Sequence, residues 1–163
     1  MAVHRLTNEQ WGFTSNCFVC EPRNAAGLGI PFDHDDTAHV VRASFALDDR
    51  FSGAPTYVHG GVTLAVLDEA MAWATIAIGG KFAVTSETTT KFAYAVKLGR
   101  TYTVEATVDE SDGTTMRTSA VVLDERRRPC VTSTAAFTVL AAAQAIGVLG
   151  VDELGDEAKF VNE

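Results

Sequence analysis

Two adjacent carboxylates interrupt an otherwise apolar segment of the chain. Asp68 and Glu69 lie in HGGVTLAVLDEAMAWA (residues 59–74), whose Ala, Leu, Val and Met residues favour an α-helix. Neighbouring positions on a helix are about 100° apart, so the two side chains must face different surroundings. A buried carboxylate without partners is costly and usually takes up a proton. At least one of the two therefore meets a hydrogen-bond donor, a cation or a water-lined cavity, unless it reaches a gap at the protein surface.

The start of this helix is suited to binding negative charge. His59-Gly60-Gly61 places two glycines where a helix exposes its free N–H groups, and glycines let another molecule approach the backbone closely. Such a helix end favours developing negative charge. A carbonyl under nucleophilic attack becomes an oxyanion, which backbone N–H donors stabilise. A carboxylate in the same site would then act as a base or a nucleophile.

The spacing of these groups predicts a site shared between two chains. Gly60 and Asp68 are eight residues apart, which is about 12 Å along a helix. A reacting carbonyl has to lie about 3 Å from both groups. Two such helices packed antiparallel across a two-fold axis would bring Gly60 of one chain beside Asp68 of the other, giving two sites per dimer. The almost entirely apolar circumference of the helix also calls for cover by a second subunit.

The elements that position these residues follow from local composition. A turn-rich segment, CEPRNAAGLGIPFDHDD, precedes a β-branched run, HVVRASFAL, that predicts a strand. The helix is expected from Gly61 to about Ile78, where Gly79-Gly80 ends it. Four further strands are expected in AVTSETTTKFAYAV, RTYTVEATVDE, TTMRTSAVVLDE and PCVTSTAAFTVL. The short separators KLG, SDG and RRRP predict antiparallel neighbours and a final meander, and therefore an α+β fold with the helix on one face of the sheet.

Length and composition limit the architecture. The 163 residues suit one domain, taken as residues 1–140, followed by an acidic tail at residues 141–163 that begins as a possible short helix. The net charge of −8 argues against a nucleic-acid surface, which needs concentrated Lys and Arg. The start MAVHRLTNEQ lacks the apolar run of a signal peptide, so a cytoplasmic location is the default expectation. Residues 62–78 approach membrane-spanning length, but each of their two central acids would cost several kcal/mol in lipid, so no membrane span is expected.

Three segments of the sequence resemble the hotdog-fold acyl-CoA thioesterases, in the branch related to the phenylacetate-pathway enzymes. The resemblance centres on His59-Gly60-Gly61 followed by Asp68, nine positions after the histidine, within LAVLDEAMAWA. The segments CFVCEPRNAAGLGIPF and AVTSETTTKF match as well, in the same order. The resemblance implies an antiparallel sheet wrapped around a long central helix, no cofactor, and assembly as a homodimer or as a tetramer of two dimers.

The resemblance also implies roles for individual residues. Asp68 would be the catalytic carboxylate, acting either as a nucleophile through a mixed anhydride or as a general base on water. The Gly60 N–H would polarise the thioester carbonyl, and His59 would order the loop or assist that polarisation. Thr85 matches a hydroxyl position that some relatives use to place water. Some relatives carry another hydroxyl one turn after the acid, where this chain has Ala72, so more weight falls on Thr85.

Local positive charge is expected to bind the phosphates of coenzyme A. The densest basic cluster is Arg126-Arg127-Arg128, in a predicted hairpin turn. Three further basic residues lie on or near another strand: Lys91, Lys97 and Arg100. The alternative for the arginines is an ordinary solvated turn.

The acyl group is expected to contact the helix and the strand that follows it. Gly61 would let the substrate approach the backbone, and Met71 and Trp73 near the helix middle would set acyl specificity together with AVTSETTTKF. Aromatic and aliphatic acyl groups both suit such a pocket, so the sequence leaves the acyl group open.

The cysteines have a metal-like spacing, but no metal is expected. Cys17-x-x-Cys20 offers two ligands, whereas a structural zinc usually takes four. Cys130 lies in a predicted strand, and a histidine would complete the set only by coincidence of folding. The resemblance suggests a packed N-terminal strand or loop here. Glu69, for which the resemblance implies no role, is expected to face a loop or a polar pocket.

Two other functions compete with hydrolysis of an acyl-CoA thioester. A hotdog-fold dehydratase or hydratase should show a histidine-bearing motif with its own acid partner, and the sequence contains no second pattern of that kind. A protein that binds or senses acyl-CoA without turnover would keep the pocket but could dispense with Asp68. The presence of Asp68 favours the hydrolase.

Overall fold

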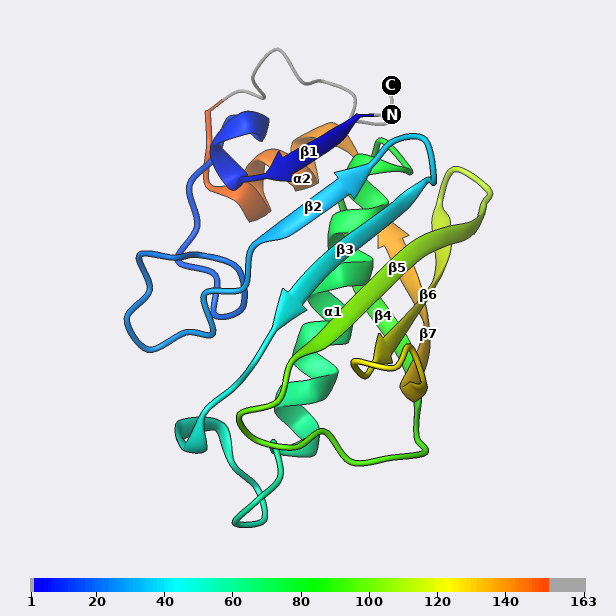
Figure 1. Ribbon diagram of the computed structural model, residues 1–163. Coiled ribbons are helices and arrows are strands. Elements are labelled where there is room, and N and C mark those ends of the chain that lie inside the picture. Colours follow the sequence, from blue (N-terminus) through cyan, green and yellow to red (C-terminus); the bar gives the residue numbers. More distant parts are fainter. Residues whose placement is uncertain (1, 153–163) are drawn as a thin grey trace.

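The chain folds as one antiparallel sheet curled around a long helix, as Figure 1 shows. This computed structural model describes residues 2–152. The helices are α1 (Gly60–Ala77) and α2 (Ala142–Leu149), with short 3-10 turns η1 (Asn8–Trp11) and η2 (Asp49–Phe51). The strands are β1 (Val3–Leu6), β2 (Phe32–Asp35), β3 (Val40–Phe45), β4 (Ala83–Phe92), β5 (Tyr102–Ser111), β6 (Thr115–Leu123) and β7 (Pro129–Val139). The predicted α+β hotdog fold is confirmed.

The strand order is β1-β2-β3-β5-β6-β7-β4, and every neighbouring pair is antiparallel. The predicted meander of the last three strands, β5 to β7, is confirmed. The prediction that KLG joins two neighbouring strands is wrong, because β4 pairs with β7 along its whole length, from Ala83↔Val139 to Phe92↔Val131. Residues 93–101 carry the chain past two strands, β7 and β6, to β5. Nine residues are long enough, since three strand spacings amount to about 14 Å.

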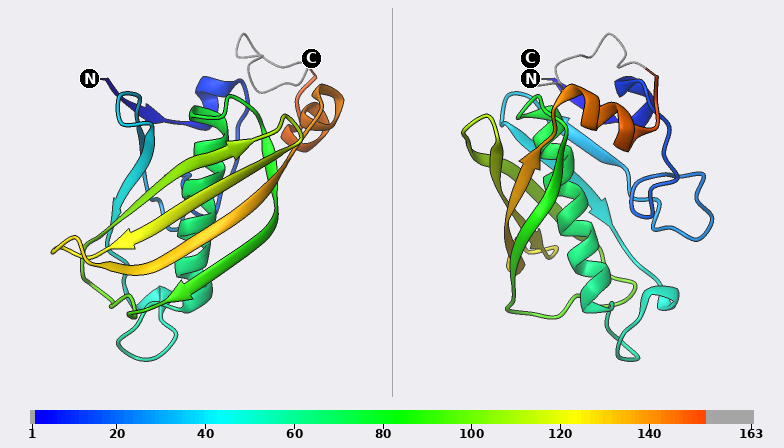
Figure 2. Two further views of the ribbon diagram at one scale, coloured as in Figure 1. Left: turned by 90° about the vertical axis from the view of Figure 1, so that its right-hand side faces the viewer. Right: turned by 180° about the vertical axis from the view of Figure 1, so that it is seen from behind.

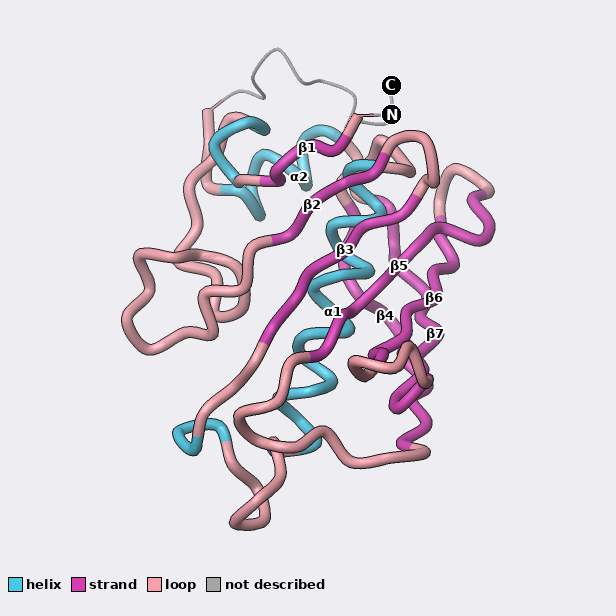
Figure 3. Tube along the Cα trace, viewed as in Figure 1, coloured by secondary structure: helices cyan, strands magenta, loops and turns pink. Residues whose placement is uncertain are grey.

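The N-terminal segment contains two short strands that the sequence does not indicate. β2 lies within the segment expected to be turn-rich, and β1 pairs with it at the sheet edge. Both strands have four residues, and the β2 sequence FDHD lacks the apolar alternation of a typical strand. Between η1 and β2, residues 12–31 form a long loop, drawn in pink in Figure 3.

One face of α1 forms the centre of the hydrophobic core. Its members are spaced three or four residues apart and at most 1% exposed: Thr63, Val66, Leu67, Ala70, Met71 and Ala74. The sheet contributes fully buried side chains to the same core: Val41, Val104, Val122, Val131 and Phe137. α1 packs mainly on β5, β6 and β3, and in Figure 2 it lies inside the curve of the sheet. This packing fixes the direction of every other side chain on the helix.

Both ends of α1 match the sequence prediction to within one residue. His59 is the N-cap, and its Nδ1 accepts a hydrogen bond from the Gly61 N–H at 2.9 Å. After the last turn, Gly79 packs so closely that a Cβ there would lie 2.6 Å from the Met116 Sδ. A glycine is therefore required where the chain leaves the helix and turns toward β4.

The remaining sequence predictions about the fold concern membranes and the tail. No helix within residues 2–152 is long and apolar enough to cross a membrane. The short helix expected at the start of the tail is α2. The acidic part, residues 153–163, lies outside the described residues, so the boundary between a domain at residues 1–140 and a tail at residues 141–163 stays a prediction.

Asp35 closes the β2–β3 turn, and its loss should destabilise the fold in a pH-dependent way. Its carboxylate accepts N–H groups of Thr37 and Ala38 at 3.1 and 2.9 Å and the Arg42 Nη1 at 2.9 Å. The hydrogen bond from the Ala38 N–H is the main cause that holds the pKa of Asp35 below its ordinary value, and Arg42 adds to it. The contribution of the Asp35 carboxylate to the stability of the fold is therefore present above the unfolded-state pKa. It is lost as the pH falls through the lower folded-state pKa.

We expect Asp35→Asn to lower Tm by a few degrees at pH 7, and the deficit relative to the parent protein to shrink below about pH 4. Thermal unfolding followed by circular dichroism across this pH range measures the effect. The control is Asp49→Asn, because Asp49 is exposed at η2. A deficit of the same size at pH 3 and pH 7 would show that the carboxylate charge is not involved.

Candidate active site

Asp68 and Thr85 meet where α1 faces the start of β4. The Thr85 Oγ1 donates a hydrogen bond to the Asp68 Oδ1 at 2.7 Å, and both residues are accessible to solvent. The register of β4 on β7 shifts between Thr85 and Glu87, so Ser86 is the extra residue of a β-bulge. Bulges redirect side chains and are common beside active sites. The structure thus joins two of the sequence-predicted site residues.

The start of α1 presents a free backbone donor. His59 is exposed, its carbonyl accepts the N–H groups of Val62 and Thr63, and its ring accepts that of Gly61. The Gly60 N–H has no acceptor assigned to it within residues 2–152. A Cβ at position 60 would lie 3.8 Å from the Phe92 ring, an ordinary contact. The Gly60 N–H is therefore available to a ligand at an accessible helix end.

Within one chain, the Gly60 N–H and the Asp68 carboxylate do not come together, since they are about 12 Å apart along α1. The side of α1 that carries Asp68, the open face, consists of residues three or four positions apart that are all partly or fully exposed: Gly61, Leu64, Ala65, Asp68 and Ala72. Gly60 lies at its beginning, next to Gly61. The right-hand view of Figure 2 shows α1 in front of the sheet. Apolar residues thus surround Asp68 on a side of α1 that residues 2–152 leave uncovered.

A basic cavity of about 630 Å³ lies beside the start of α1. Tyr57, two residues before the N-cap, lines it, and the neighbouring Val58 N–H donates to the Val96 carbonyl at 2.9 Å. The Arg128 guanidinium lies 4.1 Å from the centre of the Tyr94 ring. Three further cations line the cavity, Lys97, Arg100 and Arg126, together with two acids, Glu125 and the Asp124 that pairs with Arg128. The excess of cations makes this cavity suited to an anion.

Two predicted phosphate contacts lie elsewhere. Arg127 adopts a positive φ of 63° and directs its Nη1 to the Glu105 carboxylate at 2.9 Å, away from the basic cavity. Lys91 is exposed on β4 and is not among the residues that line the cavity. Sequence adjacency does not reveal this division, because a tight turn separates the directions of consecutive side chains.

The two predicted acyl-contacting side chains are not beside Asp68. Met71 is fully buried in the core, so within this chain it has no surface to offer to an acyl group. Trp73 is 3% exposed and lines a separate cavity of about 350 Å³ beneath the N-terminal segment. Gly61 lies at the exposed start of α1. An acyl pocket at Asp68 would therefore need walls from β4 and from outside this chain.

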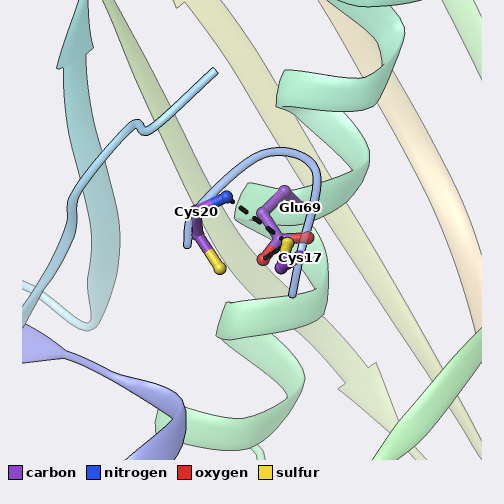
Figure 4. Close-up of side chains that lie close together, drawn as sticks. All are labelled: Cys17, Cys20 and Glu69. Carbon is purple, nitrogen blue, oxygen red and sulfur yellow. Dashed lines mark hydrogen bonds between the residues drawn. The ribbon is translucent and has the colours of Figure 1, made fainter. Parts of the chain in front are cut away.

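Glu69 faces a loop, as predicted, on a third side of α1. The Cys17 Sγ donates to the Glu69 Oε1 at 3.4 Å, and Cys20 lies beside both groups, as Figure 4 shows. Burial, followed by the nearby charge of Cys17, raises the pKa of Glu69 to about 8. The sequence offers a signal for this contact. A Cys-x-x-Cys pair and a carboxylate on an apolar helix each need a polar partner, and the two features could have been paired with one another.

Comparisons with known proteins agree with this geometry. Residues 56–131 match the family model described as the thioesterase superfamily. A solved thioesterase superfamily protein shares 25% identity at a TM-score of 0.71 over 78% of this chain, which covers 62% of that protein's length. A Streptococcus mutans protein solved bound to acetyl CoA shares 20% identity at a TM-score of 0.60, over 63% of this chain and 82% of that one.

A phenylacetic acid degradation operon protein of E. coli also has the same fold. It shares 20% identity at a TM-score of 0.62, over 70% of this chain and 81% of that one. No protein of curated function matches the sequence significantly. The matched range contains His59, Gly60, Asp68 and Thr85 and is consistent with the expectation of a thioester hydrolase. Residues 56–131, which carry α1, β4, β5 and β6, thus match the thioesterase superfamily, and the fold of the chain is similar to that of a solved thioesterase superfamily protein.

Proposed function

We propose that the protein is an acyl-CoA thioesterase, which hydrolyses an acyl-CoA thioester to the free acid and CoA with Asp68 as its catalytic carboxylate. The hydrogen bond from Thr85 to Asp68 at 2.7 Å carries the proposal, because it holds a solvent-accessible carboxylate in one orientation on an otherwise apolar face. The Streptococcus mutans protein of the same fold was solved with acetyl CoA, which supports the substrate class. The phenylacetate-related branch is supported by the E. coli protein.

The active site forms between two subunits. Two copies of α1 pack antiparallel through their open faces, which places the Gly60 N–H of one subunit near Asp68 of the other. The apolar residues of the open face support this packing, since their exposure would otherwise be unfavourable. β4 supports it as well, because it is a ten-residue edge strand whose outer side is free to pair with a second copy. A dimer, or a tetramer of two dimers, is therefore the active form.

Hydrolysis then needs two complementary groups. The Gly60 N–H donates to the thioester oxygen and stabilises the oxyanion that forms as the carbonyl is attacked. Asp68 either attacks the carbonyl carbon and displaces the CoA thiolate, giving a mixed anhydride that water cleaves, or removes a proton from a water that attacks the carbonyl and displaces the same thiolate. In both cases the thiolate takes up a proton and leaves as CoA. Thr85 orients the carboxylate by donating its O–H, and a lone pair of its hydroxyl oxygen can accept a hydrogen bond from the water. His59 keeps the loop in place by capping the helix.

The basic cavity binds the nucleotide part of CoA. Lys97, Arg100 and Arg126 supply positive charge for the phosphates, and no ion pair is assigned to these three cations within residues 2–152. Tyr57 and Tyr94 offer aromatic surface in the same cavity. Because this cavity adjoins the start of α1, a bound CoA would direct its thioester toward Gly60.

We expect Asp68→Asn to lower kcat for acyl-CoA hydrolysis by at least about 100-fold, and Thr85→Val to lower it about 10-fold through loss of a hydrogen bond to a charged group. Release of CoA from short, long and aryl acyl-CoAs measures both effects. Asp109→Asn is the matched control. The Asp109 carboxylate also accepts a hydrogen bond from a hydroxyl, that of Ser119 at 3.0 Å, but Asp109 lies on β5 and not on α1. Unchanged turnover in Asp68→Asn would refute the assignment. If the parent protein bound acyl-CoA but did not hydrolyse it, the alternative function, a protein that binds or senses acyl-CoA, would be favoured.

We expect Gly60→Pro to lower kcat about 100-fold to 1000-fold and Gly60→Ala to leave it nearly unchanged. Proline removes the N–H, yet it suits the first position of a helix, and the ψ of 132° at His59 suits the residue before it. Alanine keeps the N–H. A heterodimer of Gly60→Pro and Asp68→Asn subunits, isolated with two affinity tags, should regain about half of the parent activity, because one of its two sites is intact. An inactive heterodimer would mean that each site lies within one chain.

We expect Arg126→Gln to raise KM about threefold to tenfold for an acyl-CoA through loss of a partly solvated phosphate contact. KM for the same acyl group on pantetheine, which lacks the nucleotide, should not change. Arg127→Gln is the control, because Arg127 binds Glu105 outside the cavity. Equal effects of Arg126→Gln on both substrates would place the nucleotide elsewhere.

A further inference from the structure

Glu69 has no part in the proposed hydrolysis, and its surroundings consist of two thiols. It lies on the side of α1 that faces the N-terminal loop, one turn before the buried Trp73. One carboxylate oxygen of Glu69 and the sulfur atoms of Cys17 and Cys20 all lie within 4.8 Å of one another. In Figure 4 the loop bends over α1 so that these groups face one another. We call these three residues the thiol–carboxylate cluster.

The backbone around Cys17 is arranged to stabilise a negatively charged sulfur. The N–H groups of Val19 and Cys20 both donate to the Cys17 Sγ, at 3.4 and 3.3 Å. The Glu21 N–H donates to the Cys17 carbonyl at 3.3 Å, which closes the turn that brings the two cysteines together. Metals bind the thiolate rather than the thiol, so these contacts favour the form of cysteine that a metal requires.

The distances suit a tetrahedral metal ion. Zinc lies about 2.3 Å from thiolate sulfur and about 2.0 Å from carboxylate oxygen, so two such ligands are about 3.5 Å apart in a tetrahedral site. The Cys17 Sγ and Glu69 Oε1 are already 3.4 Å apart. We propose that Cys17, Cys20 and Glu69 bind a thiophilic divalent cation of the zinc class, with the fourth position left to a water molecule or another small ligand.

The choice of metal follows from the ligands. Two thiolates select a soft or borderline ion, such as zinc, over calcium or magnesium, which prefer oxygen ligands alone. Carboxylate oxygen binds zinc as thiolate sulfur and imidazole nitrogen do, so Glu69 can join the two cysteines as a ligand. The third ligand comes from α1, 49 positions after Cys20 in the chain.

Electrostatics supports the same conclusion. Without a cation, the cluster brings three acidic groups together. A divalent cation would stabilise all three in their charged form.

The cluster has an access route. Cys20 and Trp73 line the cavity of about 350 Å³ beneath the N-terminal segment. A metal ion and its fourth ligand could therefore reach the cluster without unfolding of the loop.

Cobalt binding tests the site on the full-length protein. Reduced, metal-free protein titrated with Co²⁺ should bind about one ion per chain, with the thiolate-to-cobalt charge-transfer band and the intense visible bands of tetrahedral cobalt, and Zn²⁺ should displace it. Cys17→Ser, Cys20→Ser and Glu69→Gln should each weaken binding at least about 10-fold, the lower limit for losing even an outer-sphere partner. Cys130→Ser is the matched control, because Cys130 is buried in β7, away from the cluster.

The measurement is independent of hydrolysis, so its failure and that of the proposed function are distinguishable. Absence of a thiolate-to-cobalt band in the reduced parent protein would overturn the site. Formation of a Cys17–Cys20 disulfide on oxidation would show that the two thiols are close, but it would not rescue the metal site. A band that persists in Glu69→Gln at unchanged affinity would remove Glu69 from the site. If a serine variant does not fold, the cobalt affinity of the near-isosteric Glu69→Gln variant becomes the deciding measurement. Zn²⁺ should raise Tm of the parent protein by several degrees, and a Tm equally raised in Glu69→Gln would contradict the proposal.

Discussion

The burial of α1 against the curved sheet is the constraint on which the rest of the structure depends. Val66, Leu67, Ala70 and Met71 are completely excluded from solvent, so the helix can neither rotate nor shift without opening a cavity in the core. Once this face is fixed, the 100° step between residues assigns every other position to a direction. Asp68 is placed on the side that the chain leaves open, and the next residue, Glu69, on the side covered by the N-terminal loop.

The open side explains why a single chain is incomplete. It combines apolar residues of α1 with the free edge of β4, two features that a monomer would expose at a cost and that a two-fold partner covers together. Asp68 lies on this side, and the Gly60 N–H, which has no acceptor within residues 2–152, lies at its beginning; the two are too far apart to act on one carbonyl. Assembly and catalysis thus have the same structural requirement in this proposal.

The sequence predicts α1, its ends, the final meander and the α+β class, because each depends on local periodicity, glycines and short turns. The partnership of Thr85 with Asp68 was indicated by resemblance and not by pattern, since the β-bulge at Ser86 that helps to direct Thr85 leaves no mark in the sequence. Met71 shows where prediction from the sequence fails. It lies three residues after Asp68, yet it is fully buried among the residues of α1 that face the sheet. The sequence does not show which side of an almost entirely apolar helix faces the sheet, so this burial could not be predicted.

Adjacent carboxylates on one helix cannot be electrically independent, even when they face different surroundings. Burial, then the charge of Cys17 and, to a smaller extent, that of Asp68 raise the pKa of Glu69. A proton on Glu69, or a cation held between Glu69 and the two thiols, removes the repulsion between the two carboxylates. The same cation would connect the loop to α1 at the residue next to the proposed catalytic acid.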